Sequence, residues 1–296
     1  MLRVILLLIF YVLTFTSIVG QVKKYFTLEN NQNFDKVNIV LTATSNSCCI
    51  KPTVNPNLVN IFGYNNDANP KIHSEIEMVE RVQNLIINLD NNGSNETSSM
   101  AKSFFSSSTE TENRWDLYLS GEKNMNLSLN YAVGDANVDL SDLPIENLNI
   151  SSGSAEVVVE YMENRPNLVQ MDSFKVKVDL GSLSVHKINY ARARTVIADV
   201  GFGALLVDYS RTLEEPSNVF ASVGAGNLII GLPEDDTIPV IINIQNSPLC
   251  NVKLPKGYKK HSKHVYISRG YEENAPNILS FNLDVVVGQI KFVDYK

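Results

Sequence analysis

Apolar and polar residues alternate along most of this chain with a period of two. In residues 174–180, FKVKVDL, every second residue is apolar and the residues between them are charged. Side chains alternate across a β-strand, so this pattern predicts strands with one covered face and one face in water. Only residues 73–82, HSEIEMVERV, offer a helix candidate, and their apolar spacing is ambiguous. The pattern therefore predicts an all-β protein.

The alternating strands recur as copies of one unit. Each copy contains a short strand, a glycine beside a small residue, and a second short strand. A strand that bends sharply at every copy needs a residue without a Cβ at the corner. One such unit cannot bury its apolar face alone, so the copies are expected to stack. The predicted corner glycines are Gly134, Gly153, Gly181, Gly203, Gly226 and Gly288, and the long last step is expected to hold an insertion.

The glycine-centred series VGDANVDLS, SGSAEVVVEY, GFGALLVDYS and GAGNLIIGLP resembles the toast-rack domains. These domains occur in LiaF-like proteins of bacterial envelope stress responses and in candidate bacterial adhesins. The resemblance covers about residues 113 to 245. It implies a stacked β architecture, an envelope location and no enzymatic activity, and it transfers no catalytic residue. A cleavable signal stands where LiaF-like proteins have a membrane-spanning module, which favours the adhesin-like branch.

We therefore predict a repeat-built stacked β-sheet, a β-solenoid-like toast-rack domain with an N-terminal β cap. Residues 1–20 are expected to be a signal peptide. Residues 21–112 are expected to form a β-rich capping region with an Asn/Ser-rich loop. Residues 113–296 are expected to form the toast-rack repeat domain, in one continuous domain with the capping region.

The first twenty residues have the layout of a secretory signal. Arg3 precedes an apolar run, and Gly20 provides a small residue at the expected cleavage point. The run from Val4 to Phe15 is shorter than the roughly 20 residues needed to span a bilayer. We expect an exported protein in the periplasm, on the cell surface or secreted, which is not an integral membrane protein after cleavage. The formal net charge is −7, and no basic cluster is strong enough to favour nucleic acid as a partner.

The chain contains three cysteines: Cys48, Cys49 and Cys250. In an oxidising compartment a disulfide from Cys49, or from Cys48, to Cys250 is possible, and it would leave one odd thiol. The alternative is that all three are unpaired and buried as small apolar residues.

No motif predicts a metal or cofactor site. Asp135, Asn137 and Asp139 have the spacing of a calcium loop, with Glu146 in the twelfth place, but Leu140 stands where such a loop needs glycine. The exposed face of a strand explains this spacing better. His261 and His264 lie in a lysine-rich segment and lack a third ligand, which favours a basic surface loop.

Acidic residues could line one face of the stack, as they do in solenoid enzymes that act on polysaccharides. We regard a solvated face as the better interpretation. These acids are Asp135, Asp139, Glu156, Glu160, Asp179, Asp199 and Asp208.

The sequence as a whole predicts a non-enzymatic, exported cell-envelope protein that is an adhesin-like or structural binding scaffold. Its partner would be an unidentified envelope protein or a glycan, and no cofactor, catalytic residue or metal ligand is predicted. The alternatives are a β-solenoid polysaccharide-active lyase or glycosidase, and an envelope stress-response module.

Overall fold

The computed structural model describes residues 23–64, 71–90, 114–162, 164–209, 213–233 and 238–295. The signal peptide expected at residues 1–20 lies outside this part of the chain. The described residues form sixteen strands of one β-sheet and a single short 3₁₀ helix. Among the described residues, no helix is long and apolar enough to cross a bilayer. The prediction of an all-β, stacked architecture is confirmed.

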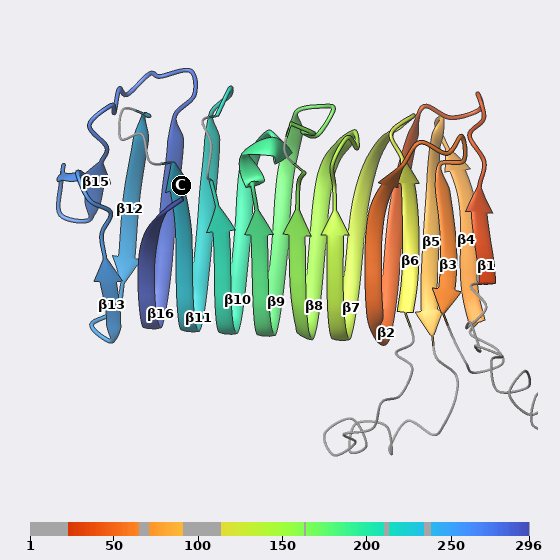
Figure 1. The fold of residues 1–296 in the computed structure, drawn as a ribbon, viewed down its shortest axis with the longest axis horizontal. Coiled ribbons are helices and arrows are strands. Elements are labelled where there is room, and N and C mark those ends of the chain that lie inside the picture. Colours follow the sequence, from red (N-terminus) through yellow and green to blue (C-terminus); the bar gives the residue numbers. More distant parts are fainter. Residues whose placement is uncertain are drawn as a thin grey trace, which may run out of the picture.

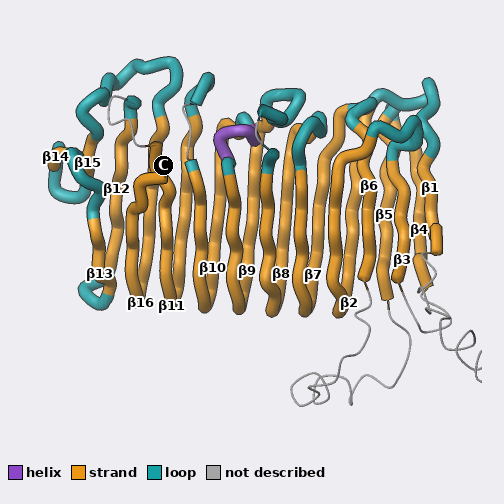
Figure 2. The backbone as a smooth tube through the Cα atoms, in the orientation of Figure 1, coloured by secondary structure: helices purple, strands orange, loops and turns teal. Residues whose placement is uncertain are grey.

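Long strands that lie side by side form the centre of the molecule (Figure 1). They pair in parallel, and each position lies opposite the equivalent position of the next strand. In Figure 2 each strand runs down one side, turns at the lower edge and returns on the other side. In spatial order these strands are β2 (Lys36–Thr53), β7 (Asn124–Asp139), β8 (Ile145–Glu160), β9 (Met171–His186), β10 (Ala193–Asp208), β11 (Ser217–Pro233) and β16 (Leu279–Tyr295).

The core lies between the two halves of each bent strand. In β7, Leu127 and Leu129 of the first half are buried, as are Ala136 and Val138 of the second half. The residues at the bend, 132–135, are not buried. Each half therefore alternates with a period of two, the phase shifts by one residue at the bend, and both halves direct every second side chain into one shared apolar core.

The N-terminal end of the stack is closed by shorter strands. β5 (Val82–Asp90) pairs with the first half of β2, and β6 (Arg114–Ser120) pairs with its second half. β4 (Lys71–Val79) lies antiparallel to β5, β3 (Val59–Tyr64) lies antiparallel to β6, and β1 (Lys23–Leu28) lies beyond β3. This is the N-terminal β cap. β2, which belongs to the region expected to form the cap, instead lies inside the stack next to β7.

The C-terminal end contains the insertion expected between Gly226 and Gly288. β12 (Val240–Asn246) and β13 (Cys250–Lys253) pair with the two halves of β16, and the antiparallel β14 (Lys259–Lys260) and β15 (Val265–Ile267) follow at the edge of β12. Although β16 comes last in the chain, it lies between β11 and β12.

Five of the six predicted corner glycines lie in one register column along the lower edge. In this column Gly181 is opposite Gly203, Gly203 is opposite Gly226, and Gly226 is opposite Gly288. Gly134 is the first glycine of this column. All five glycines have φ between 131° and 148°, a backbone conformation that residues with a side chain rarely adopt. The assignment of Gly153 to this column is wrong. Ala155 occupies that place in β8, and Gly153 lies two residues earlier in the bend.

The predicted disulfide is contradicted by the fold. Cys48 and Cys49 lie in β2 and Cys250 lies in β13, and all three are free thiols. Six strands separate β2 from β13 across the sheet. At the usual spacing of about 4.8 Å between strands this is roughly 34 Å, whereas a disulfide requires Cα atoms within about 7 Å. The alternative of three unpaired, buried cysteines holds in part: all three are unpaired, and Cys48 and Cys49 are buried, but Cys250 is only partly buried.

Candidate functional site

The first halves of the strands at the N-terminal side of the stack present a column of amide and hydroxyl side chains to the outside. Because the strands are in register, equivalent residues of neighbouring strands lie next to each other. We call this column the asparagine ladder, and in spatial order its members are Asn84, Asn38, Asn126, Asn147 and Ser173.

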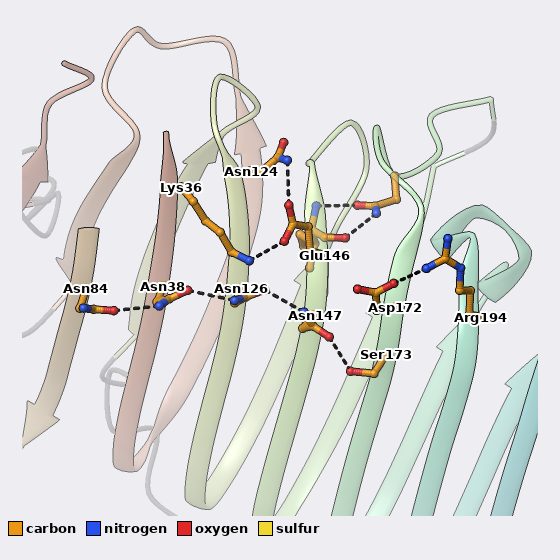
Figure 3. Close-up of polar contacts among 12 residues, drawn as sticks. Lys36, Asn38, Asn84, Asn124, Asn126, Glu146, Asn147, Asp172, Ser173 and Arg194 are labelled. Carbon is orange, nitrogen blue, oxygen red and sulfur yellow. Dashed lines mark hydrogen bonds and ion pairs between the residues drawn. The ribbon is translucent and has the colours of Figure 1, made fainter. Parts of the chain in front are cut away.

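Each member of the asparagine ladder is hydrogen-bonded to the next (Figure 3). Asn38 donates to the Oδ1 of Asn84 over 2.8 Å, and Asn126 donates to the Oδ1 of Asn38 over 2.9 Å. Asn147 donates to Asn126 over 3.0 Å, and the hydroxyl of Ser173 donates to Asn147 over 2.8 Å. The bonds run in one direction across five strands, so the amide planes are held at fixed positions.

The asparagine ladder leaves hydrogen-bonding capacity on its outer side. A carboxamide carries two N–H donors and two acceptor lone pairs, and the bonds within the ladder use one of each at Asn38, Asn126 and Asn147. These three residues are partly buried and lie on the outer face of the sheet. The result is an ordered row of donors and acceptors spaced by about 4.8 Å, the distance between strands.

Uncharged polar residues continue on the same face below the ladder. They occupy the next outward positions of β7 and β8, whereas in β2 the apolar Val40 comes between Asn38 and Thr42. Each of these polar side chains is partly or fully exposed. Together with three ladder members they form a surface that we call the polar face. It consists of Asn38, Thr42, Asn126, Ser128, Asn130, Asn147, Asn149 and Ser151.

Ion pairs border the polar face at its upper edge (Figure 3). Glu146 accepts hydrogen bonds from the ammonium group of Lys36 and from the amide of Asn124. The Lys36 hydrogen bond lowers the pKa of the Glu146 carboxyl group, with a further contribution from Asn124 and against a smaller opposing effect of burial. Farther along, Arg194 pairs with Asp172 at 2.6 Å. Lys36 reaches from β2 across β7 to Glu146 of β8, whereas Arg194 and Asp172 lie on the neighbouring strands β10 and β9. The polar face itself carries no charged residue, and the exposed Lys175 and Lys177 of β9 lie beside it, opposite Asn149 and Ser151.

The seven acids considered for catalysis do not gather at one place. Asp199 lies in the first half of its strand, Asp135 and Asp179 lie at bends, and the other four lie in second halves. Asp135 lies opposite Glu156, and Asp139 lies opposite Glu160. The seven acids therefore do not line one face, the arrangement considered as the alternative to a solvated face.

Most of these acids serve local structure. Asp139 accepts hydrogen bonds from the backbone N–H and the hydroxyl of Ser141 and so fixes the turn after β7. The hydroxyl of Ser222 donates to Asp199 over 2.6 Å, and Asp179 pairs with Lys177 at 3.0 Å. Further bonds reach Asp135 from Ser47 and Asp208 from the backbone of Lys187.

The residues that resembled a calcium loop form regular strand. In β7, Asp135 and Asn137 are exposed and alternate with buried Ala136 and Val138. His261 and His264 are exposed near the C-terminal end of the stack, and the His261 ring lies 6.3 Å from that of Tyr271. Within the described ranges, no three His, Cys, Asp or Glu residues are grouped so that they could hold a metal ion.

The sequence of residues 62–186 matches the family described as the N-terminal domain of toast_rack, DUF2154. This segment belongs to the toast-rack family. The toast-rack segment contains every member of the asparagine ladder except Asn38, together with the β7 and β8 parts of the polar face. No curated protein matches the chain in sequence.

Several solved structures are similar to this chain at low sequence identity. A candidate cell adhesion protein from Clostridium sporogenes is 15% identical with a TM-score of 0.45, over 93% of this chain and 100% of that one. A candidate adhesin from Bacteroides fragilis is 12% identical with a TM-score of 0.36, over 92% and 96%. A candidate adhesin from Parabacteroides merdae is 13% identical with a TM-score of 0.33, over 93% and 97%.

Sequence reasoning missed the asparagine ladder, although the toast-rack segment contains a signal for it. The residue eight positions before the corner is Asn126 in β7, Asn147 in β8 and Ser173 in β9. Asn38 has the same spacing from Asn46, the residue opposite Gly134. A recurring amide or hydroxyl at a fixed distance from the corner of a parallel stack predicts such a ladder.

Proposed function

We propose that this protein is an exported, non-enzymatic, adhesin-like scaffold that binds an extended glycan along the polar face. The observation that carries the proposal is the asparagine ladder, which holds donors and acceptors in a straight row. Glycans carry many hydroxyl groups, each of which can donate and accept a hydrogen bond. An uncharged row of amides and hydroxyls is complementary to a neutral polymer of this kind.

Affinity in this mechanism comes from repetition. A single hydrogen bond exchanged with water contributes only about 0.5–1.5 kcal/mol. Several such bonds along one polymer act together, because after the first contact the next sugar is already held near its partner. The rigid sheet contributes by fixing the amides before binding, which reduces the ordering cost. The polar face would therefore prefer a polymer to its free monomer.

The positions of the acidic residues favour a binding scaffold over a polysaccharide-cleaving enzyme. A glycosidase needs two carboxyl groups about 5–9.5 Å apart on either side of the bond to be cleaved. Here Asp139 and Asp199 are bonded to serine hydroxyls, and Asp179 is paired with a lysine. Their hydrogen bonds serve turns and strand contacts, which is the role expected of acids in a scaffold.

The test is binding to a panel of neutral and acidic polysaccharides, measured by microarray and by sedimentation with insoluble polymers. Asn149→Asp places a charge on the exposed part of the polar face, and Asn137→Asp makes the same change at an exposed position in the second half of β7. We expect binding to a neutral polymer that Asn149→Asp weakens about tenfold and Asn137→Asp leaves unchanged. Equal effects of the two variants, or release of reducing ends from the polymer, would contradict the proposal.

A further inference from the structure

The C-terminal end of the stack carries a charge opposite to that of the rest of the chain. Residues 250–271 contain six Lys and Arg and no Asp or Glu. The remaining 274 residues contain 19 Lys and Arg against 32 Asp and Glu, a formal net charge of −13. The fold places residues 250–271 in β13, β14, β15 and their connections, at the left-hand end of the sheet in Figure 1. One end of an acidic protein is therefore basic.

We call this surface the basic end. Six of its members come from residues 250–271, and a seventh, Lys291 of β16, lies opposite Lys253 of β13. All seven residues are exposed. They are Lys253, Lys256, Lys259, Lys260, Lys263, Arg269 and Lys291.

The lysines of the basic end differ in their partners from cations elsewhere in the protein. The ion pairs among the described residues all lie outside the basic end, and each joins a Lys or Arg to an Asp or Glu. Lys253 and Lys291 instead lie side by side on paired strands, where like charges repel each other. An anion that approaches this end meets ammonium groups that no described carboxylate neutralises.

Protection of a sheet edge explains only part of the basic end. The lysine pair of β14 lies at a free edge, where charge disfavours pairing with another chain. Lys291 lies on β16, which is paired with β11 on one side and with β13 on the other. Its charge therefore protects no edge, which favours a binding role for the surface.

The backbone of the basic end is held in place before a ligand arrives. β14 and β15 form a hairpin, whose turn is closed by hydrogen bonds from the N–H groups of His261 and Ser262 to the carbonyl of Val265, over 2.9 and 3.2 Å. The hairpin is joined to β12 through the buried hydroxyl of Ser268, which accepts from the N–H of Val240 over 3.0 Å. The lysines of the hairpin are thus attached to fixed backbone positions.

We propose that the basic end binds an acidic glycan through carboxylate, sulfate or phosphate groups spaced along the polymer. A lysine ammonium is a point charge without the bidentate geometry of arginine, so the surface selects for repeated negative charge. A flat anionic membrane that met this end would also approach the acidic remainder of the protein. A single polymer chain can contact the basic end alone, and charges more than about 8 Å away are largely screened at physiological salt. This site is separate from the polar face and does not rest on it.

The test is titration calorimetry of the whole protein with polygalacturonate, dextran sulfate and dextran phosphate at 50 and 200 mM NaCl. The three polymers distinguish carboxylate, sulfate and phosphate groups as the source of the charge. We expect at least one of them to bind at 50 mM NaCl, with an affinity that falls about 100-fold at 200 mM if roughly five lysines displace counterions. No binding of any of the three at 50 mM NaCl, or binding that salt leaves unchanged, would overturn the proposal.

A matched pair of variants separates the basic end from the net charge of the protein. Lys259→Gln combined with Lys260→Gln removes two ammonium groups from the basic end, whereas Lys175→Gln combined with Lys177→Gln removes two exposed ones from β9. The first variant should weaken binding at 50 mM NaCl about tenfold and reduce the slope of log K against log [NaCl] by about 1.5. The second should change neither quantity, and equal effects of the two variants would refute the site.

Two other polyanions test the choice of a glycan as the partner. They are a DNA duplex and vesicles of phosphatidylserine mixed with phosphatidylcholine. We expect both to bind more weakly than the best acidic glycan at the same salt concentration. Tighter binding of either one would overturn the assignment of a glycan.

The two proposals fail in different ways. Neutral-polymer binding that Asn149→Asp weakens, with no binding of any acidic glycan, would remove the basic end as a site and leave the polar face intact. Acidic-glycan binding that the Lys259 and Lys260 variant weakens, with no neutral polymer bound, would support the basic end and remove the role of the polar face.

Discussion

The corner column makes a strong prediction at Gly203. Gly203 has φ +143°, and a Cβ built on it would lie 1.7 Å from the carbonyl oxygen of Gly181 on the neighbouring strand. A backbone conformation of this kind costs a residue with a side chain about 1–3 kcal/mol. The oxygen belongs to the backbone of a paired strand, so relieving the clash also weakens roughly two ladder hydrogen bonds at about 1 kcal/mol each. Gly203→Ala should therefore lower the free energy of unfolding by about 3–5 kcal/mol.

Urea denaturation followed by circular dichroism measures this loss. The matched control is Ala155→Gly, which changes the same column in the opposite direction in β8. Ala155 is 7% exposed, and removing its single buried methyl group should cost only about 1 kcal/mol. If Gly203→Ala changes the free energy of unfolding by less than about 0.5 kcal/mol, steric crowding between stacked corners is not what requires glycine there.

Three further predictions concern the ladder, its border and the thiols. Asn126→Ala removes the central amide of the asparagine ladder and two of its bonds, and should lower stability by about 1–2 kcal/mol in urea titrations, whereas Asn149→Ala on the same face should cost less than about 0.5 kcal/mol. Glu146→Gln should lower stability by about 0.5–1 kcal/mol at pH 7. The stability difference between wild type and Glu146→Gln should shrink as the pH falls through the lowered pKa of Glu146. The wild-type carboxylate then becomes protonated and loses its pairing with Lys36. A stability difference that grows on acidification would refute this role of the ion pair. In the native protein an alkylating reagent should label Cys250 before Cys48, because Cys48 is fully enclosed and burial raises the pKa of its thiol to about 12. Mass spectrometry of the labelled protein gives the order of labelling. A Cys48–Cys250 or Cys49–Cys250 disulfide in the absence of reductant would contradict the fold.

The alternation of apolar residues was sufficient to predict the stacked β architecture. Each half of a long strand obeys a period of two, so the pattern identifies the buried residues within each half. The phase shifts by one residue at the bend, for example between Leu129 and Ala136 of β7, so the two halves must be assigned separately. The bend itself was predictable wherever the column contains glycine, as at Gly181, Gly203 and Gly226. Ala155 shows where glycine fails to mark the bend. In β8 the corner column contains this alanine, so a pattern based on glycine assigns the corner to Gly153 instead.

The order of the strands was not predictable from this pattern. β2 carries the same alternation as β7, but its corner contains Ser45 and Asn46 instead of glycine, so a search for glycine corners passes over it. The copies have equivalent apolar faces, and any of them could pack beside any other. The period of two therefore does not predict that β11 pairs with β16 and not with β12.

Both ends of the stack place an interior strand out of chain order. At one end β2 pairs with β7 while the later strands β5 and β6 lie outside it, and at the other end β16 pairs with β11 while the earlier strands β12 and β13 lie outside it. Each end therefore has a continuous long strand next to the repeats and an interrupted one beyond it. An unpaired strand edge is a template for association with other chains, and short, broken edge strands reduce that risk. The lysine pair of β14 lies at one such edge, exposed on both sides. This arrangement disfavours growth of the stack through its ends, so we expect an assembly of this protein along a polymer to depend on the polymer more than on sheet-to-sheet pairing.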